Sequence, residues 1–235
     1  MRDIAIAAAL AFGCLVIQSG VQAAPKNSAL KVTSPAPKTE QDTDTIKANP
    51  KAWDKEPDSF LGIKFNEPLT VDPCPIKHIS TYTESLAYDI MRLLPGVCLD
   101  PLDSNYKYGD HDNNTLKIRN VPDIGVGYDV DVTIKNGVVT KFTIDLKQYG
   151  YLLLLSAFKE RYGDPTSIYN DTVKNNAGGE FNSLNVEWKG KKITISMRER
   201  YLMVDKSYVT ISDNATEEAE AAKDRAKRAS EAQKF

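Results

Sequence analysis

Cys74 and Cys98 are the two residues of this sequence whose type and spacing predict a definite chemistry. They are the thiols that remain once Cys14 is removed with the N-terminal signal segment described below, and thiols in an oxidising compartment form disulfides. Neither belongs to a Cys-x-x-Cys pair, the spacing typical of redox-active thiols. We therefore expect one structural disulfide, whose closed loop of about 25 residues restricts the unfolded chain by roughly 3 kcal/mol.

Histidine bases are scarce, since His78 and His111 are the only two. The chain contains no Gly-x-Ser-x-Gly elbow and no His-Glu-x-x-His motif. The segment around Gly125 and Gly127 leads into a predicted strand, which excludes a phosphate-binding loop. The chain offers His78 no nearby acid that would orient it as a general base. We therefore assign no catalytic residue and no cofactor.

The acidic segment 110–114 has the alternating oxygen ligands with which a calcium loop begins. Thr115, however, occupies the position where the sharp turn of such a loop requires glycine, and Val121 occupies the position of the closing glutamate. We therefore expect a solvated loop here and assign no metal ligand.

Tyrosine is frequent, with eleven residues that include the closely spaced pairs Tyr106 and Tyr108, and Tyr149 and Tyr151. Tyrosine is favoured at binding surfaces because it buries a large area at low entropic cost and keeps a hydroxyl for hydrogen bonding. Tyrosine is also common in the cores of small α+β domains, and core packing is the favoured interpretation. The alternative is a binding face, for which Tyr106 and Tyr108, with the exposed hairpin edge, are the candidates.

Composition divides the chain into four parts. Residues 1–23 combine Arg2, a short apolar run and a small-residue end, the pattern of a cleaved secretory signal peptide, with membrane anchoring as the lesser alternative. Residues 24–51 are rich in Lys, Ser, Thr and Pro and are expected to form a disordered linker. A folded domain is expected over 52–212, and a charged helical tail over 213–235. The mature protein is thus expected in the periplasm or outside the cell, and not as an integral membrane protein.

The charge balance limits the kinds of partner. Removal of the signal segment takes one Arg and one Asp from totals of 30 basic and 32 acidic residues, so the net charge stays at −2. A nucleic-acid-binding protein needs a clustered surplus of Lys and Arg to neutralise phosphates, so nucleic acid is not expected as a partner. A protein or a component of the cell envelope is expected instead.

The clearest local pattern is a hairpin around Asn136-Gly137. Apolar and polar residues alternate over 128–134 and again over 138–146. The alternation favours a three-residue loop with a G1 bulge at Gly137. That loop places Ile134 opposite Val138, so the apolar residues of both strands share one face. A sheet with one wet face is expected to be mainly antiparallel.

Helical spacing of apolar residues predicts two helices in the domain. One runs from Tyr151 to Tyr162 and ends at Gly163. The other begins at Thr81, where Glu84 completes a capping box, and stops at Pro95-Gly96.

Further strands complete the expected fold. They surround Trp188, Ile195 and Val209, and residues 60–65 form a strand or a core-plugging segment. In the tail, a capping box of Asn214 with Glu217 opens a mostly polar helix. The expected fold class is α+β, a mainly antiparallel sheet of about 4–6 strands with helices on one face, a flexible N-terminal tether and a charged C-terminal helix.

The helix end Arg161-Tyr162-Gly163-Asp164-Pro165-Thr166 follows an Asn-Gly hairpin and precedes a strand that ends in Trp. This arrangement resembles small exported bacterial proteins of unassigned function that carry a Tyr-Gly-x-Pro-Thr signature, and residues 60–63 with Cys74-Pro75 resemble the openings of such chains. The resemblance covers about residues 58–212 and implies a one-sided α+β sandwich, similar in style to β-lactamase-inhibitor-like and outer-membrane assembly lipoprotein modules. It implies no catalytic residue, and this chain lacks the lipobox of the lipoprotein version.

These observations favour an exported, disulfide-stabilised binding or envelope-interaction protein that is not an enzyme. One alternative is a protein inhibitor of an envelope or exogenous enzyme, which predicts one-to-one, disulfide-sensitive inhibition. Another is a hydrolase with an unrecognised site, which predicts turnover that survives deletion of residues 213–235.

Overall fold

The computed structural model describes residues 53–110 and 112–233, which belong to one compact unit. The predicted signal segment 1–23 and linker 24–51 lie outside the described residues, as does His111. Within the described part, no helix is both long enough and apolar enough to cross a membrane.

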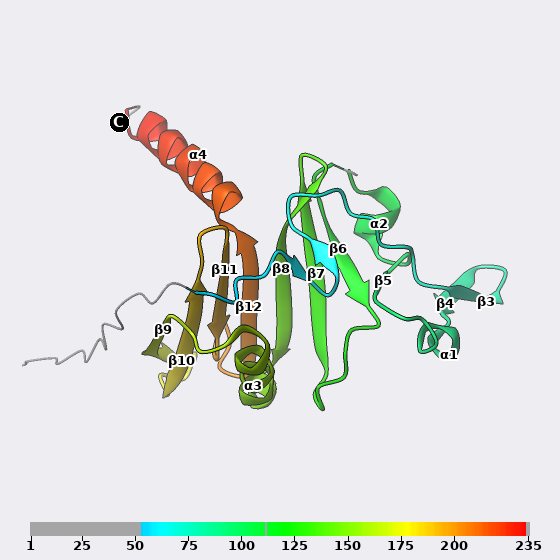
Figure 1. Ribbon diagram of the computed structural model, residues 1–235, viewed down its shortest axis with the longest axis horizontal. Helices are drawn as coiled ribbons and strands as arrows, with labels where there is room; N and C mark the ends of the chain where they lie inside the picture. The colour runs from blue at the N-terminus through cyan, green and yellow to red at the C-terminus, as the bar shows by residue number, and fades with distance from the viewer. Residues whose placement is uncertain (1–52, 111, 234–235) are drawn as a thin grey trace, which may run out of the picture. The chain divides into compact units, whose positions relative to one another are not determined.

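An eight-stranded sheet forms the body of the domain (Figure 1). Its strands lie in the order β5-β6-β7-β8-β12-β11-β10-β9, and every pairing is antiparallel. The expected antiparallel α+β class is confirmed, with a larger sheet than the four to six strands expected. The bounds are β5 Cys98–Leu99, β6 Asn114–Arg119, β7 Tyr128–Lys135, β8 Val138–Lys147, β9 Ser167–Lys174, β10 Glu180–Lys189, β11 Ile193–Arg198 and β12 Lys206–Asp213.

Strands β5, β6 and β9 account for the additional size of the sheet. β9 is mostly exposed at one edge of the sheet, so its sequence carries no alternation of apolar residues. β5 has only two residues, and β6 alternates only through Leu116 and Ile118. Alternation marks a strand only where one of its faces is buried over several residues, which explains why these three were not expected.

The β7–β8 hairpin has the expected position but a different loop. Ile134 pairs with Val139, and Asn136 with Gly137 forms a two-residue loop. Both loop residues have positive φ, 51° and 77°, as a type I′ turn requires. The predicted three-residue loop, with Ile134 opposite Val138, is wrong.

A bulge in β8 aligns the apolar residues of the two strands on one face, the alignment for which the longer loop was predicted. The register shifts by one residue beside Ile134, where Thr140 is the extra residue of β8. Beyond it Val132 faces Phe142, and the apolar rows of the two strands are aligned again. A bulge and a longer loop correct the parity by the same single residue, so alternation alone does not distinguish them.

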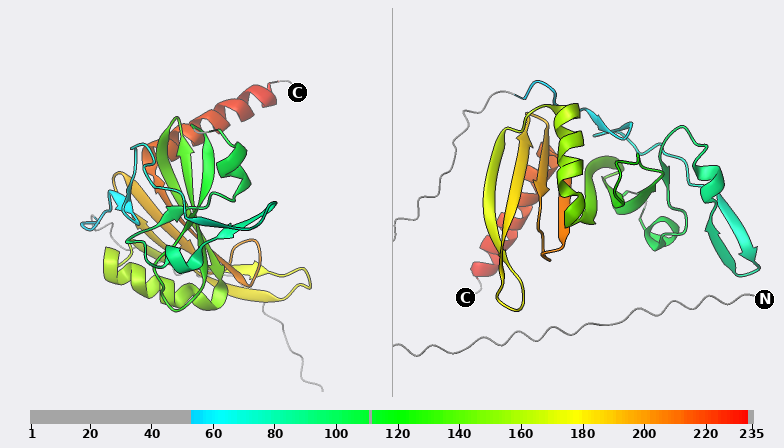
Figure 2. Two further views of the ribbon diagram at one scale, coloured as in Figure 1. Left: turned by 90° about the vertical axis from the view of Figure 1, so that its right-hand side faces the viewer. Right: turned by 90° about the horizontal axis from the view of Figure 1, so that it is seen from below.

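Helix α3 (Tyr151–Tyr162) packs on one face of the sheet, as expected (Figures 1 and 2). At its start the Tyr151 hydroxyl donates a hydrogen bond to the Leu184 carbonyl over 2.9 Å. At its end the Trp188 indole N–H donates to the Gly163 carbonyl, also over 2.9 Å. Gly163 ends the helix with a φ of 79° and a ψ of −168°, a positive-φ conformation that glycine adopts without strain.

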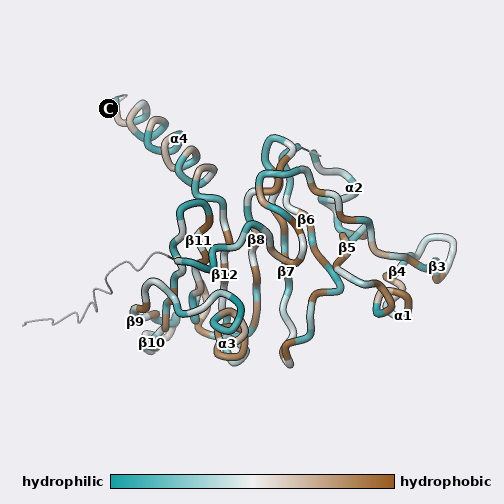
Figure 3. The backbone as a smooth tube through the Cα atoms, viewed as in Figure 1, coloured by the Kyte–Doolittle hydropathy of each residue, from teal (hydrophilic) through white to brown (hydrophobic). Residues whose placement is uncertain are grey.

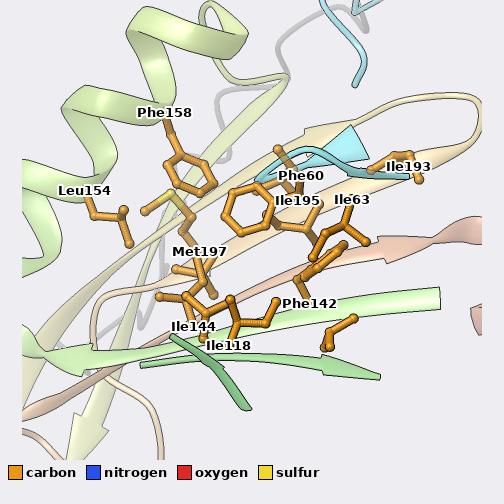
Figure 4. Close-up of a cluster of buried hydrophobic side chains, with 14 of the residues drawn as sticks. Phe60, Ile63, Ile118, Phe142, Ile144, Leu154, Phe158, Ile193, Ile195 and Met197 are labelled. Atoms are coloured by element: carbon orange, nitrogen blue, oxygen red, sulfur yellow. The ribbon is translucent and has the colours of Figure 1, made fainter. Parts of the chain in front are cut away.

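A two-stranded ribbon plugs the same core. It consists of β1 (Ser59–Phe60) and β2 (Ile63–Lys64). The Phe60 ring meets Phe142 edge-on with centroids 5.2 Å apart, and Figure 4 shows Phe60 among side chains of the sheet and α3. The expected strand or core plug at residues 60–65 is confirmed.

The segment after Cys74 forms a hairpin instead of a helix. Its elements are β3 (Ile76–Ser80), β4 (Thr83–Leu86) and the four-residue α1 (Tyr88–Met91). The helix predicted from Thr81 is therefore wrong over its first two turns. Isoleucine, threonine and tyrosine dominate this run and favour strands, and a single capping box does not outweigh them. The remaining short helices are α2 (Ser104–Tyr108) and η1 (Gln148–Gly150).

The expected charged helix near the C-terminus is α4 (Asn214–Ala232), and none of its residues is buried. Its N-cap is Asp213, whose carboxylate accepts a hydrogen bond from the Thr216 backbone N–H over 2.8 Å. The capping box predicted for Asn214 is therefore wrong by one residue. Glu217 instead forms an ion pair with Lys141 of β8.

Candidate functional site

Cys74 and Cys98 form the expected disulfide, with their Cα atoms 4.9 Å apart. Cys98 lies in edge strand β5, and the backbone N–H of Cys74 donates to the Leu99 carbonyl over 2.8 Å. The bond closes residues 75–97 into a loop at this edge of the sheet, and we call these residues the arm. Leu86 and Met91 pack with the two cysteines as a small separate core.

The arm exposes large apolar side chains to solvent. Figure 3, which colours the backbone by residue hydropathy, shows hydrophobic residues at α1 of the arm. Tyr82, in the turn of the hairpin, is 96% exposed, and Leu93, beyond α1, is 83% exposed. Monomeric proteins rarely leave such a concentration of apolar surface uncovered, and exposed patches of this kind mark interaction sites. The exposed large apolar residues of the arm are Ile76, Ile79, Tyr82, Tyr88, Ile90 and Leu93.

The arm also carries a short chain of charged side chains. His78 Nδ1 lies 3.5 Å from Glu84 Oε1, and Glu84 Oε2 lies 3.7 Å from Lys107 Nζ of α2. The expectation that His78 has no acid near it is therefore wrong, because the hairpin places Glu84 directly opposite it. The His78 side chain remains largely exposed to water, an environment that does not favour general-base catalysis.

The structure separates the members of each tyrosine pair. Tyr108 is 86% exposed at the end of α2, whereas Tyr106 is half-buried and packs against the main core. Residues two apart on a helix point to different sides, so these two do not form one face. Tyr149 is likewise exposed, and Tyr151 is fully buried.

Tyr106 lines a pocket of about 330 Å³ bounded by α2 and strands β5, β6 and β7. Leu99, Leu116 and Ile134 contribute apolar walls from the three strands. Of the two predicted tyrosines, Tyr106 is therefore placed at a concave surface.

Asp110, Asp112 and Asn114, described residues of the acidic segment, line this pocket. The Asp110 carboxylate accepts a hydrogen bond from the Asp112 backbone N–H over 2.9 Å and from the Asn113 side-chain amide over 3.2 Å. Among residues 53–110 and 112–233, no group of three or more His, Cys, Asp or Glu side chains is placed to hold a metal ion.

The face of the sheet opposite α3 brings three carboxylates together. Asp129 and Asp145 lie opposite each other on β7 and β8, and Asp131 follows on the same side. Burial raises the pKa of Asp131, Lys117 opposes that shift, and the other two carboxylates add to it. Arg119 offsets part of the charge by an ion pair with Asp129 at 3.2 Å. This row follows from the alternation of Asp129 and Asp131, a signal that our sequence interpretation left unused.

The binding potential of the arm was also missed at the sequence level. The run from Ile76 to Thr83 contains mainly Ile, Tyr and Thr, which favour strands, and only Lys77 as a good helix former. A strand prediction there would have placed Ile79 and Tyr82 on a short hairpin, which buries little surface by itself. The disulfide spacing would then have marked the hairpin as a closed, displayed loop.

The chain matches no protein-family model, no curated protein and no solved structure. The resemblance based on the segment around Tyr162 and Gly163 therefore stays a prediction.

Proposed function

We propose that this protein is an exported, non-enzymatic binding protein that docks another protein through the arm. The observation that carries the proposal is the exposure of six large apolar side chains on one segment closed by a disulfide. Structural disulfides persist in oxidising compartments, which supports a location in the periplasm or outside the cell. The signal segment predicted over residues 1–23 supports the same location.

The charges of the arm favour a protein as the partner. The arm contains two basic residues, Lys77 and Arg92, and two acidic residues, Glu84 and Asp89, so neither sign predominates. Binding to an anionic membrane surface depends on a surplus of basic residues, and binding to nucleic acid depends on a larger one. Aromatic and aliphatic groups surrounded by mixed charges instead match the apolar core and polar rim of a protein interface.

The proposal is tested by site-specific photo-crosslinking in the exported protein. A photoreactive phenylalanine analogue replaces Tyr82 in one sample and Tyr149 in the other. Both tyrosines are strongly exposed, but only Tyr82 lies on the arm, so Tyr149 is the matched control. We expect a discrete crosslinked complex from position 82 and none from position 149.

Two further variants identify the contribution of each region. Ile79→Ser removes one exposed apolar group of the arm and is expected to weaken the crosslink. Deletion of residues 213–235 removes the charged helix and is expected to leave the crosslink unchanged. Loss of the crosslink on deletion of this helix, or equal crosslinking from position 149, would overturn docking through the arm.

The inhibitor hypothesis is a special case of this proposal, in which the docked partner is an enzyme. A purified 1:1 complex that lowers the activity of the crosslinked enzyme, and loses this effect when Cys74 and Cys98 are reduced, would establish it. The hydrolase hypothesis instead requires turnover by the protein alone, after deletion of residues 213–235 as well as before.

A further inference from the structure

The two edge strands of the eight-stranded sheet differ in length and in what lies beyond them. β5 has two residues, and the segment before it covers its outer side. There the Leu99 backbone N–H donates to the Asp72 carbonyl over 3.0 Å, and the Leu99 carbonyl accepts from the Cys74 N–H over 2.8 Å. β9 has eight residues, and within the described part of the chain no strand pairs with its outer side (Figure 1). One end of the sheet is therefore covered, and the other is open to a further strand.

The backbone groups of β9 point alternately toward β10 and toward the open side. One pair beyond the end of the β9–β10 ladder, the Asn175 N–H donates to the Gly179 carbonyl over 2.9 Å. Hydrogen-bonded pairs alternate in an antiparallel ladder, so the odd-numbered residues of β9 bond to β10. The even-numbered residues present their N–H and C=O groups to the open side, and they are Ile168, Asn170, Thr172 and Lys174.

β9 lacks most of the features that keep an exposed edge strand from pairing. Such strands are blocked by proline, by lysine, by bulges or by very short length. β9 contains no proline, and its one lysine, Lys174, is its last residue. Asp171 is its only other charged residue, and residues 168–172 are all exposed. A partner strand therefore meets no steric block along the middle of β9.

A second copy of β9 fits this edge by its own sequence. Side chains directly opposite each other in an antiparallel pair lie on the same face of the sheet. A two-fold axis between two copies must therefore pass through a residue position and not between two positions. The midpoint of β9 lies between Asn170 and Asp171, so an axis at either residue keeps nearly the whole strand paired.

Charge decides between these two axes. An axis at Asp171 sets this carboxylate against its own copy in a non-hydrogen-bonded pair, with Cα atoms about 4.5 Å apart, and like charges directly opposite destabilise a sheet. An axis at Asn170 places Asp171 opposite Tyr169 of the second copy. It also places Ile168 opposite Thr172. No like charges of the two strands then face each other, and the outward backbone groups of Asn170 meet those of its copy.

We propose that β9 pairs with β9 of a second copy of this chain about a two-fold axis at Asn170, which joins the two sheets into one. The pairing forms about six backbone hydrogen bonds. The Thr172 N–H, which donates to the exposed Asp171 carboxylate over 2.7 Å in the single chain, donates to the Ile168 carbonyl of the second copy instead. This interface uses the same surface on both copies and therefore closes on two. The arm leaves the sheet at the opposite edge, so the dimer does not depend on docking through the arm.

The first test is the mass of the purified exported protein in solution, measured by analytical ultracentrifugation. We expect a monomer–dimer equilibrium with a dissociation constant of about 100 µM, weak because one strand pair buries less area than a standard interface. Thr172→Pro removes an outward N–H without removing a bond to β10, and it should weaken the dimer about tenfold. Thr172→Ala keeps the N–H and is the matched control, which should dimerise like the unmodified protein.

The second test is disulfide crosslinking, which reports the register. In Asn170→Cys the two new cysteines have Cα atoms about 5.5 Å apart, within the reach of a disulfide. In Thr172→Cys, the matched control on the same strand, they are roughly 14 Å apart. We expect mild oxidation to link the first variant through residue 170 of both copies, as peptide mass mapping shows, and to link the second at least about tenfold less.

Three results would overturn the proposal. The first is a monomer at all concentrations up to about 1 mM, the result expected if β9 takes a strand from a different protein instead. The second is a dimer that Thr172→Pro leaves unchanged, or assemblies larger than two copies. The third is equal crosslinking from positions 170 and 172.

Discussion

The half of the sheet under α3 and the arm both contain many large apolar residues, but they use them in opposite ways. Under α3, Trp188, Phe142 and Ile195 are completely buried. In the arm, Tyr82 and Leu93 are almost completely exposed, although they belong to the same compact unit.

The difference lies in what surrounds each region. Strands β8, β12, β11 and β10 present a continuous apolar face that α3 and the β1–β2 ribbon cover. The arm has one two-stranded hairpin, and an isolated hairpin buries too little surface to be stable in water. Its small core around Leu86 and Met91 is supplemented by the disulfide. The disulfide therefore stabilises the arm, whereas side-chain packing stabilises the sheet. Stabilisation by a covalent bond does not require burial, so the apolar side chains of the arm remain exposed.

The largest effect is expected from a truncation in the packed region. Trp188→Ala should lower the free energy of unfolding by about 4 kcal/mol, because it leaves a cavity and removes the indole bond to Gly163. Tyr82→Ala, the matched truncation in the arm, should change it by less than about 0.5 kcal/mol. Urea denaturation measures both. A comparable loss for the two variants would contradict the contrast between the regions.

Removal of the disulfide should affect the arm before the sheet. In the double variant Cys74→Ser with Cys98→Ser, we expect the protection of arm amides to fall by roughly 3 kcal/mol, the amount the chain-entropy model assigns to this loop. Native-state hydrogen exchange measures it residue by residue. Amides of β7 and β8 should keep their protection, and an equal loss in those strands would show that the two regions unfold as one.

Asp213 tests a polar contribution to the packed region. Burial favours its neutral form, but hydrogen bonds from Asn66 and Thr216 outweigh burial and hold its pKa below the usual value. Asp213→Ala should cost about 1 kcal/mol near neutral pH through loss of the helix cap. This contribution is fully present above about pH 4, the unfolded pKa, and disappears as the pH falls through the lower folded pKa. Denaturant unfolding of both proteins between pH 7 and pH 2 measures it, and a difference that persisted at pH 2 would contradict the assignment.

The smallest effect is expected from a substitution of Asp131, on the face of the sheet opposite α3. Its pKa is raised mainly by burial, and its Oδ1 has no hydrogen-bond partner within the described structure. Asp131→Asn should stabilise the fold at pH 7 by about 0.5 kcal/mol, a small value because solvent screens the site. The advantage should vanish below about pH 4, where the raised pKa leaves Asp131 protonated in the folded state and the charge is absent. Thermal unfolding with Asp54→Asn as a control measures it, and an equal gain from the control would remove the explanation.

The parts of the fold predicted correctly have strong local patterns. Helix α3 combines apolar residues at helical spacing with Gly163 as its end, and β10 to β12 alternate through Trp188 and Ile195. The helix predicted from Thr81 failed because its apolar spacing was short and its composition favoured strands. The hairpin loop at Asn136 failed because a bulge at Thr140 and a longer loop produce the same alternation.

The candidate sites were only partly predictable. The pairing of Cys74 with Cys98 followed from their number and predicted location and is confirmed. The pocket joins Tyr106 to Asp112 and Ile134, which come from separate segments of the chain. No spacing rule connects these residues, because strand pairing and the position of α2 bring them together.

The sequence by itself determined the antiparallel α+β class, the helix under the sheet, the charged C-terminal helix and the disulfide. Each depends on composition or on periodicity within one segment, and local chemistry is sufficient to specify it. The tertiary structure alone decided that Tyr82 and Leu93 remain exposed and that Tyr106 faces a pocket. Exposure and concavity depend on which surfaces the rest of the chain covers, and that outcome is a property of the packed molecule.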